Sequence, residues 1–377
     1  MLFRSVPVYA STLARGLLAN KLKEAKVSAN PLRKLDPGDR LELGAFTIEP
    51  FRVGHSIPDA MGLAIHTPVG TVVHTGDFKF DQTPVDGRGT DFDILARLGA
   101  EGVVALVSDS TRAEVPGYTP SERVVGETFR GIMSEAQGRV IVATFASNIA
   151  RIQQVIDAAE ALGRRVAVVG RSMEQNSKIA RDLGYLTMKR PFVSKEEIPR
   201  RAKEPLVIAT TGAQGEPMAG LAKMGNAEHR NVEIQPGDTV IVSASPIPGN
   251  EEAVGRTIDN LFRAGANVVY HSIAPVHVSG HASREELKMM ISLTKPKNFV
   301  PMHGEIRMQV AHGRLATEMG VSPQNVFISG NGVPIEFHAD GSARRRPAVA
   351  HGQVFVDGSS VGEISEVVLR DRRTLAD

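Results

Sequence analysis

The sequence predicts an α/β protein in which an antiparallel sheet region is followed by a largely parallel one. Through the middle of the chain, strand-like runs rich in Val, Ile and Thr alternate with segments of helical apolar periodicity, the pattern of βα units. Between Phe46 and Asp77 the strand-like runs follow one another without helices, as in an antiparallel meander. The 377 residues suffice for two or more domains, since a single core stops growing near about 250 to 300 residues.

Each predicted element has a local signal. The predicted strands, in chain order, are "FTIEPFRV", "GTVVHTGD", "VVALVSDS", "RVIVATFA", "VAVVG", "LVIATTG", "DTVIVSAS", "NVVYHS" and "NFVPMHG". "NIARIQQVIDAAEALG" repeats apolar residues at helical spacing and ends on Gly163, and "SREELKMMISLTK" opens with a Ser-x-x-Glu capping box from Ser283 to Glu286. The basic, proline-containing "ARRRPA", residues 343–348, predicts a linker after the last strand pair.

Composition narrows the class of protein. Hydrophobic residues make up 42% and charged residues 23%, and no run approaches the roughly 20 apolar residues that a membrane span needs. The first segment is interrupted by Arg4 and Arg15, so we expect no signal peptide. The chain has no cysteine, which excludes disulfides and thiolate ligands, and we expect a cytoplasmic protein. A net charge of +2 does not by itself indicate nucleic-acid binding.

Polar or glycine-rich clusters follow six of the predicted strands. They are "HTGD" at 74–77, "SDST" at 108–111, "FASN" at 145–148, "TTGAQGEP" at 210–217, "SASPIPGNE" at 243–251 and "MHGE" at 302–305. Any one of them could simply form a turn or a helix cap. Because ligands bind beyond the carboxyl ends of strands in open α/β sheets, six such clusters together predict a binding site at that edge.

The histidines near the strand ends predict a metal. His55, Asp77 and His303 each stand at or just past a predicted strand end, and imidazole with carboxylate is a ligand set for zinc or manganese. Each residue also has a structural alternative, because a histidine at a strand end can bond the backbone and Asp77 can close a turn. We predict that the three meet at one rim of the sheet.

The stretch "HVSGHAS", residues 277–283, places two imidazoles and two hydroxyls directly after an apolar strand. A metal, a phosphate or a structural hydrogen-bond network would each explain it. His281 and Asp109 are suited to orienting a ligand or moving a proton. Free backbone N–H groups at a helix start favour a phosphate, which makes Ser279, Gly280, Ala282 and Ser283 candidates for binding it. Ser147, Asn148 and His281 are further candidates for binding phosphate or RNA. We therefore expect an anion beside a metal.

A family resemblance is carried by eight motifs in order, over nearly the whole chain from Val6 to "VGEISEVVLRDRR". They are "VGHSIPDAMG", "HTGDFKFD", "SDSTRAEVPG", "FASNIARIQQ", "TTGAQGEPMAGL", "SASPIPGNE", "HVSGHAS" and "PMHGE". The chain resembles ribonuclease J, a β-CASP member of the metallo-β-lactamase superfamily. The resemblance implies a metallo-β-lactamase αββα sandwich, with its first segment at 1–122 and its return segment at 276–345. A β-CASP domain would be inserted at 123–275, and 346–377 would form a linker and the start of a C-terminal domain.

The resemblance also implies roles for single residues. His55 and Asp77 resemble the third and fourth metallo-β-lactamase motifs, and the carboxylate of Asp77 would bridge two metals. Asp109, His281 and His303 resemble the three β-CASP motifs. His303 would be a metal ligand, while His281 would contact the scissile phosphate and protonate the leaving group. Catalysis would therefore rest on Asp77, Asp109 and His281.

The resemblance implies a function as well. The reaction would be metal-dependent hydrolysis of RNA in processing and decay, as a 5′-to-3′ exoribonuclease with endoribonuclease activity. Two divalent ions, Zn²⁺ with Mn²⁺ or Mg²⁺ as alternatives, would clamp the attacking and leaving oxygens. The partner would be RNA with a 5′-monophosphate, in the cytoplasm and without a membrane. The full-length family implies a homodimer or tetramer.

One departure from the family pattern bears on activity. The motif His-x-His-x-Asp-His does not occur, because no two histidines are separated by a single residue and no Asp-His pair exists. We expect the N-terminal strands that carry it in relatives to be missing, and the chain to be a fragment with an impaired metal site. Two functions stay open: a metal-dependent ribonuclease, or a catalytically inactive RNA-binding protein on the same scaffold. The presence of His55, Asp77 and His303 favours the first. A hydrolase of another phosphodiester or ester is a further alternative.

Overall fold

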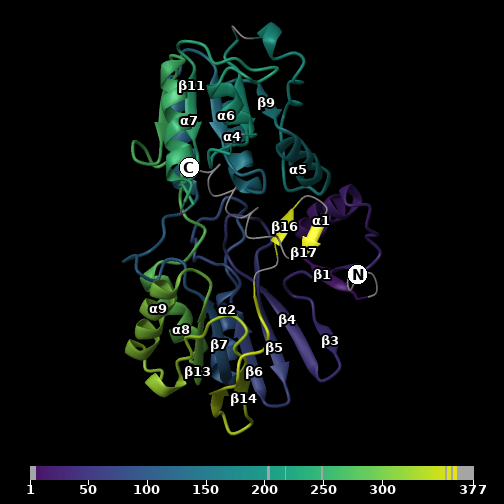
Figure 1. Ribbon diagram of the computed structural model, residues 1–377, viewed down its shortest axis with the longest axis vertical. Helices are drawn as coiled ribbons and strands as arrows, with labels where there is room; N and C mark the ends of the chain where they lie inside the picture. Colours follow the sequence, from purple (N-terminus) through teal and green to yellow (C-terminus); the bar gives the residue numbers. More distant parts are fainter. Residues whose placement is uncertain are drawn as a thin grey trace.

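The computed structural model describes residues 6–201, 204–216, 218–247 and 249–352, with the backbone of 355–357 and 360–362 in addition. Two sheets dominate it, one in the lower and one in the upper half of Figure 1. The expected α/β class, an antiparallel region followed by parallel strands, is confirmed. The described residues include no helix that is both long and apolar enough to cross a membrane. Residues 363–373 of the terminal motif "VGEISEVVLRDRR" and most of the expected segment 346–377 lie outside the described residues.

The lower sheet has six strands in the order β13-β7-β6-β5-β4-β3. In that order they are β13 (Asn298–Met302), β7 (Val103–Asp109), β6 (Gly70–His74), β5 (Met61–Thr67), β4 (Phe46–Arg52) and β3 (Leu41–Leu43). Pairs from β3 to β6 are antiparallel, which confirms the predicted meander, whereas β6, β7 and β13 run parallel. The carboxyl ends of these three strands therefore meet at one edge.

Three helices complete the core of the lower half: α2 (Phe92–Glu101), α8 (Arg284–Thr294) and α9 (Ile306–Glu318). The predicted capping box of α8 is present, with the Ser283 side chain accepting from the third helical residue and Glu286 accepting from Ser283. Buried side chains from sheet and helices fill one cluster, among them Phe51, Leu95 and Phe299. The helices lie beside the sheet in Figure 1.

The upper sheet has five parallel strands in the order β12-β11-β8-β10-β9. They are β8 (Val140–Ala143), β9 (Val166–Val169), β10 (Val207–Thr210), β11 (Thr239–Val242) and β12 (Asn267–Tyr270). The helices of this half are α3 (Arg123–Glu135), α4 (Ile149–Ala161), α5 (Arg171–Asp182), α6 (Gly220–Gly225) and α7 (Glu251–Arg263).

The continuous apolar runs of the upper strands follow from burial of both sheet faces. Along β8, Val140 and Val142 join one core cluster while Ile141 and Ala143 join another. Each strand therefore has no solvent-facing side that would need polar residues. The predicted helix over "NIARIQQVIDAAEALG" is confirmed as α4, which ends one residue before Leu162 and two before Gly163.

Smaller elements flank the two sheets. β1 (Val8–Ala10) and β2 (Leu32–Lys34) pair in parallel around α1 (Thr12–Glu24), which packs against α5 and so bridges the halves. β14 (Ile335–Phe337) pairs with β15 (Ala343–Arg345), and β16 (Phe355–Asp357) with β17 (Ser360–Gly362). Pro199–Arg201 and Pro323–Asn325 form single 3-10 turns. The prediction of a linker from residue 343 was wrong for its first three residues, because Arg344 bonds Glu336 across the β14–β15 pair at 2.8 Å.

A candidate metal centre between the two sheets

Four side chains meet at the carboxyl edge of the lower sheet. Asp77, Asp109, His281 and His303 each offer one nitrogen or oxygen atom, and these atoms all lie within 4.8 Å of one another. Asp109 is the last residue of β7, His303 directly follows β13, and Asp77 follows β6 by three residues. His281 arrives from the segment that returns from the upper half just before α8. The parallel order of β6, β7 and β13 thus assembles the group.

Asp109 and His281 form a fixed pair. The carboxylate can only accept, so Nδ1 of His281 carries the proton that it donates to Oδ2 of Asp109 at 2.7 Å. The other carboxylate oxygen accepts from the Thr111 backbone N–H at 3.0 Å and from its hydroxyl at 2.6 Å. Both oxygens of Asp109 are therefore occupied, and the free atom of this pair is Nε2 of His281.

The pair also shifts both pKa values. Burial raises the pKa of Asp109, but the hydrogen bond and charge of His281 outweigh burial and lower it to about 2. Burial lowers the pKa of His281, yet the hydrogen bond and charge of Asp109 leave it above the ordinary histidine value. This pair is therefore suited to holding a proton on the His281 ring.

Asp77 and His303 are the accessible donors of the group. Their side chains are 41% and 49% exposed, and Nε2 of His303 lies 3.8 Å from Oδ2 of Asp77. His303 adopts a left-handed backbone conformation with φ of 57° in the turn between β13 and α9. Non-glycine residues in this region are uncommon and often mark functional turns. The turn brings the ring within 5.6 Å of the His281 ring, between centroids.

His55 lies beside the four-residue group and outside it. Its Nδ1 is 2.8 Å from the carbonyl oxygen of Gly280, and its ring packs edge-on against that of His281 at 5.1 Å. Burial lowers the pKa of His55, which favours a neutral ring with the proton on Nδ1. A Cβ at position 280 would come within 2.7 Å of this ring, so only glycine fits there. Of the three residues predicted to meet at one rim, Asp77 and His303 therefore lie in the group, whereas His55 lies beside it.

A cavity of about 350 Å³ opens next to His281. Of the predicted phosphate-binding residues, Ser147, Asn148, Ser279, Gly280 and His281 line it. It lies at the ends of β8 and β11, whose connections leave in opposite directions along the sheet. Such a switch point is the usual ligand crevice of a parallel sheet.

The structure places Ala282 and Ser283 elsewhere. Ala282 is 1% exposed and belongs to the core of the lower half. Ser283 is fully buried and caps α8, with its hydroxyl 2.8 Å from that of Thr119. The capping box that made Ser283 recognisable in the sequence is what consumes its hydrogen-bonding groups. Its neighbour Ala282 is needed for packing.

Sequence analysis did not single out several residues around the site. Phe145, Ser245, Ile247 and His277 also line the 350 Å³ cavity. His277 stood in the "HVSGHAS" motif without a role; burial, then the charge of Arg151, lowers its pKa to about 3, so the ring is neutral. Ser245 follows β11 within "SASPIPGNE", the cluster that could have identified it.

The donor set of the group fits a metal ion and supports a metal cofactor. Imidazole nitrogen and carboxylate oxygen suit zinc, manganese and similar divalent ions. Asp77 and His303 have accessible donor atoms, whereas Asp109 is occupied by its hydrogen bonds and a protonated His281 ring has no free lone pair for a metal. Two carboxylates held close together also need a positive partner, which a cation would supply.

Comparisons with known proteins show which families the chain is similar to. Residues 137–261 match the family described as "Ribonuclease J, beta-CASP domain", and residues 265–329 match "Zn-dependent metallo-hydrolase RNA specificity domain". The chain is 46% identical to "Ribonuclease J" of Thermus thermophilus, covering 99% of this chain and 65% of that protein. It is 43% identical to "Ribonuclease J2" of Bacillus subtilis, covering 99% and 67%.

A third relative agrees with this placement, and one solved structure shares the fold. "Ribonuclease J" of Mycobacterium tuberculosis is 44% identical over 98% of this chain and 66% of that protein. The chain thus spans about two thirds of the length of these curated relatives. A crystal structure of a protein of unknown function from Enterococcus faecalis shares the fold, with a TM-score of 0.60 and 16% identity over 91% of this chain and 76% of that one.

Proposed function

The chain belongs to the ribonuclease J family, and we propose that it acts as a metal-dependent ribonuclease on RNA. The observation that carries the proposal is that His281 belongs to the four-residue group and also lines the 350 Å³ cavity. A phosphodiester held in that cavity lies beside both the metal donors and a proton donor. The arrangement supports in-line hydrolysis better than binding alone.

Each residue of the group has a proposed part in the reaction. Asp77 and His303 hold the ion, with His55 as a further ligand through Nε2. When bound, the ion supplies activation of water and stabilisation of negative charge on the phosphate. Asp109 orients the His281 ring and stabilises its protonated form, as a buried carboxylate does for a catalytic histidine. His281 donates the Nε2 proton to the leaving oxygen.

The bond changes balance as a simple hydrolysis. A water oxygen attacks phosphorus and loses a proton to solvent, the bond from phosphorus to the 3′ oxygen breaks, and the His281 proton passes to that oxygen; His281 then takes up a proton from solvent. The products are a 5′-mononucleotide and an RNA with a new 5′-monophosphate. Hydroxyl and amide groups of Ser147, Asn148 and Ser279 would hold the terminal phosphate, which supports 5′-to-3′ exonuclease action with some endonuclease activity.

The remaining details are proposals of the same kind. We propose Zn²⁺ as the ion, with Mn²⁺ or Mg²⁺ as alternatives, RNA with a 5′-monophosphate as the substrate, and RNA processing and decay in the cytoplasm as the setting. We also propose the domain limits 1–122, 123–275, 276–345 and 346–377, and a homodimer or tetramer for the full-length family member.

The donors of this polypeptide favour weak metal binding. The motif His-x-His-x-Asp-His does not occur in the sequence, and a two-metal site needs more ligands than His55, Asp77 and His303 provide. We therefore propose that the 377-residue chain by itself holds one ion weakly and cleaves RNA slowly.

An RNA cleavage assay tests the proposed function. RNA labelled at its 5′ end is incubated with the chain and Zn²⁺ or Mn²⁺, and the products are resolved by length. The proposal predicts slow release of labelled mononucleotide that stops with EDTA and requires Asp77. RNA that is bound but not cleaved under all metal conditions would favour the alternative of an inactive RNA-binding protein.

A further inference from the structure

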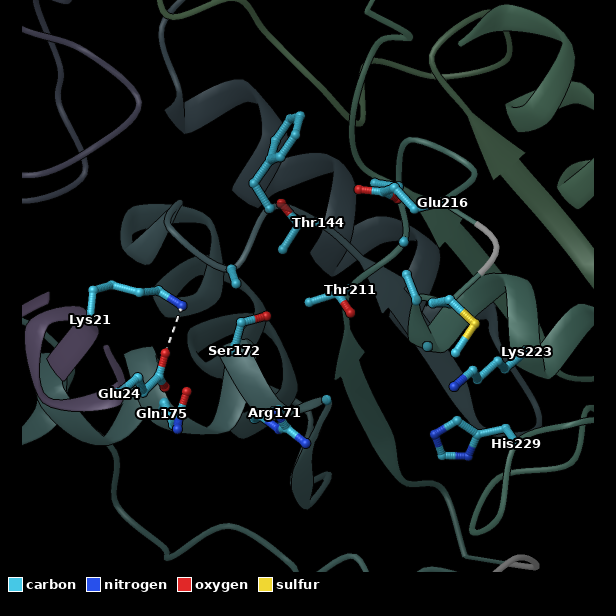
Figure 2. A pocket seen from close by; sticks show the side chains of 18 residues that line it. Lys21, Glu24, Thr144, Arg171, Ser172, Gln175, Thr211, Glu216, Lys223 and His229 are labelled. Carbon is cyan, nitrogen blue, oxygen red and sulfur yellow. Dashed lines mark hydrogen bonds and ion pairs between the residues drawn. The ribbon is translucent and has the colours of Figure 1, made fainter. Parts of the chain in front are cut away.

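A second and larger cavity lies away from the metal group, at the carboxyl ends of β8, β9 and β10 (Figure 2). Its volume is about 760 Å³, within the range of roughly 300 to 1,000 Å³ typical of small-molecule sites. Part of the "TTGAQGEP" cluster, to which the proposed function assigns no role, lines it through Thr211, Gly212 and Glu216. Among the described residues it shares only Phe145 with the cavity beside His281.

The start of α5 supplies free backbone donors to this cavity. Gly170 is the N-cap, with φ of 113°, and its own N–H is accepted by the Glu174 carboxylate at 3.3 Å, whereas no side chain accepts from the N–H groups that follow it. Gly170, Arg171 and Ser172 all line the cavity. The first N–H groups of a helix have no intrahelical partner, and with the helix dipole they favour an anion.

A buried hydroxyl provides an independent sign of a ligand. Thr144 follows β8 and lines the cavity, and its side chain is 1% exposed. Its hydroxyl has no hydrogen-bond partner within the described part of the chain. Buried hydroxyls are normally satisfied, so an unpartnered one at a cavity wall indicates a group that binds there. Thr144, Thr211 and Ser172 lie around the centre of the cavity in Figure 2.

Cationic side chains surround these donors. Arg171 lines the cavity from the start of α5 and Lys223 from α6, and neither has an ion-pair partner among the residues described. Lys21, in contrast, is paired with Glu24 at 3.2 Å. Glu216 is the other carboxylate of the lining and accepts the Gln214 backbone N–H at 3.3 Å. Among the described lining residues, the charges without an ion-pair partner are thus the cations Arg171 and Lys223 and the carboxylate of Glu216, which leaves the lining with one net positive charge.

A neutral histidine completes the ring of donors. Nδ1 of His229 accepts the backbone N–H groups of Asn231 at 3.3 Å and Val232 at 3.1 Å. Burial, and then the charge of Lys223, lowers the pKa of His229, so the proton is on Nε2. That N–H is available to an oxygen acceptor.

We propose that this cavity binds the phosphate group of a nucleotide, separately from the metal group. The phosphate would lie among the α5 N–H groups, the hydroxyls of Thr144 and Thr211, and the Arg171 and Lys223 cations. Phe145, at the wall common to both cavities, offers a ring on which a base can stack. The nucleotide can be a free mononucleotide or one unit of an RNA strand; only the second source rests on the proposed function.

Equilibrium binding with EDTA present tests the proposal, because cleavage is then blocked. The probes are fluorescent adenosine 5′-monophosphate and a labelled single-stranded RNA. Arg171→Gln and Lys223→Gln should each weaken binding of at least one probe by about tenfold, the usual cost of a lost charged hydrogen bond. Arg130→Gln, an exposed arginine on α3, is the matched control and should bind as the parent does.

Thr144→Val separates binding from folding. Valine has the same shape and removes a hydroxyl without a partner, so the free energy of unfolding should not fall. Binding of the same probe should nevertheless weaken severalfold. A valine variant that is less stable and binds normally would contradict the assignment of this hydroxyl to a ligand.

The two probes identify the source. Weakened mononucleotide binding supports a free nucleotide, and weakened RNA binding with no mononucleotide binding supports a strand that extends from one cavity to the other. If Arg171→Gln and Lys223→Gln bind both probes as Arg130→Gln does, the proposal is overturned. An RNA cleavage assay distinguishes this proposal from the proposed function. If the parent chain does not cleave RNA, only the proposed ribonuclease function is contradicted.

Discussion

At the scale of single residues, Glu286 shows how a side chain outside the reaction shapes the centre. It is fully buried on α8. One carboxylate oxygen accepts the Phe80 backbone N–H at 2.8 Å, and the other accepts those of Thr119 at 2.7 Å and Ser283 at 2.8 Å. It thereby joins the loop of Asp77, the segment that leaves β7 and the segment of His281.

Glu286→Gln should therefore destabilise the protein. A carboxamide presents an NH₂ group to backbone donors on one side, which leaves at least one buried N–H without a partner at a cost of about 1 to 3 kcal/mol. Chemical denaturation measures the change. Glu285→Gln is the control on the same helix, because Glu285 is half exposed and pairs only with Lys288 at 3.2 Å; its effect should stay within about 0.5 kcal/mol.

The proposed division of labour between His281 and His303 gives a second prediction. His281→Gln should lower the rate of RNA cleavage by roughly 10² to 10⁴, the usual contribution of a general acid, while metal content stays unchanged. His303→Gln should lower both the rate of RNA cleavage and the metal content. Cleavage kinetics and metal analysis of the same preparations provide the comparison. Loss of metal in His281→Gln would identify His281 as a ligand instead of a proton donor.

Sequence reasoning identified most of these residues but could not assign their contacts. Asp109 and His281 were expected to move a proton, and the structure pairs them at 2.7 Å. His55 was expected at the metal rim, yet its approach to Gly280 depends on a contact 225 residues away in the chain. Glu286 was recognised only as a helix cap, because its bonds to Phe80 and Thr119 are tertiary. The catalytic and metal roles of all these residues stay predictions.

At the scale of elements, the packing of α9 against β13 contains a buried histidine that reaches the residue following β7. His312 on α9 is fully buried, with Nδ1 3.0 Å from the Ser110 hydroxyl and Asp109 as the charged group nearby. Burial outweighs the Asp109 charge and lowers the pKa of His312 to about 3. The folded protein therefore keeps this ring neutral where the unfolded chain, with an ordinary pKa near 6.5, takes up a proton.

Stability should consequently fall in acid. Below about pH 6.5 the unfolded state binds more protons than the folded state, so unfolding becomes easier by about 1 kcal/mol per pH unit for this ring, down to its folded pKa. His312→Gln should flatten the dependence between pH 6.5 and 5, while the exposed His351→Gln should leave it unchanged. Denaturation curves at several pH values give the slopes. An identical slope in His312→Gln would contradict the buried neutral ring.

Elements with strong local patterns were predictable from the sequence. The apolar runs of β8 to β12 and the capped helices α4 and α8 carry their signals within a few residues. The pair of β14 and β15 does not, since "ARR" shows no apolar alternation and depends on the bond between Arg344 and Glu336. Short edge pairs of this kind are decided by partner contacts that sequence periodicity does not show.

At the scale of the whole molecule, a buried charge network joins the two halves. Arg151 on α4 is fully buried and donates to Glu122 at 2.6 Å, next to the point where the chain enters the upper half. It also donates to the Val276 carbonyl at 3.2 Å, where the chain returns. Lys79, two residues after Asp77, lies 3.5 Å from Glu122. The metal loop and both crossings thus share one network.

A double-mutant cycle measures the strength of this network. Arg151→Met and Glu122→Gln should each cost about 3 to 5 kcal/mol, because each leaves an uncompensated buried charge. The double variant should cost clearly less than the sum of the two. The exposed pair of Arg97 and Glu101, 3.1 Å apart on α2, is the control and should couple by less than about 1 kcal/mol. Additive effects for Arg151 and Glu122 would contradict a shared network.

The arrangement of two halves around one centre was accessible only through the family resemblance. Periodicity indicated two kinds of sheet, but not that β7 and β13, separated by the whole upper half, pair in parallel with Asp109 opposite Met302. That register places His303 beside Asp109 and creates the centre. Strand pairing over such sequence distances has no local signal.

Metal stoichiometry tests the central claim most directly. The 377-residue chain is dialysed against Zn²⁺ and, separately, Mn²⁺, and the bound ion per chain is counted by plasma mass spectrometry beside the Asp77→Asn/His303→Gln variant. The account predicts at most one weakly held ion per folded chain, and none in the variant. Two tightly held ions, or one that persists in the variant, would show that other residues form the metal site.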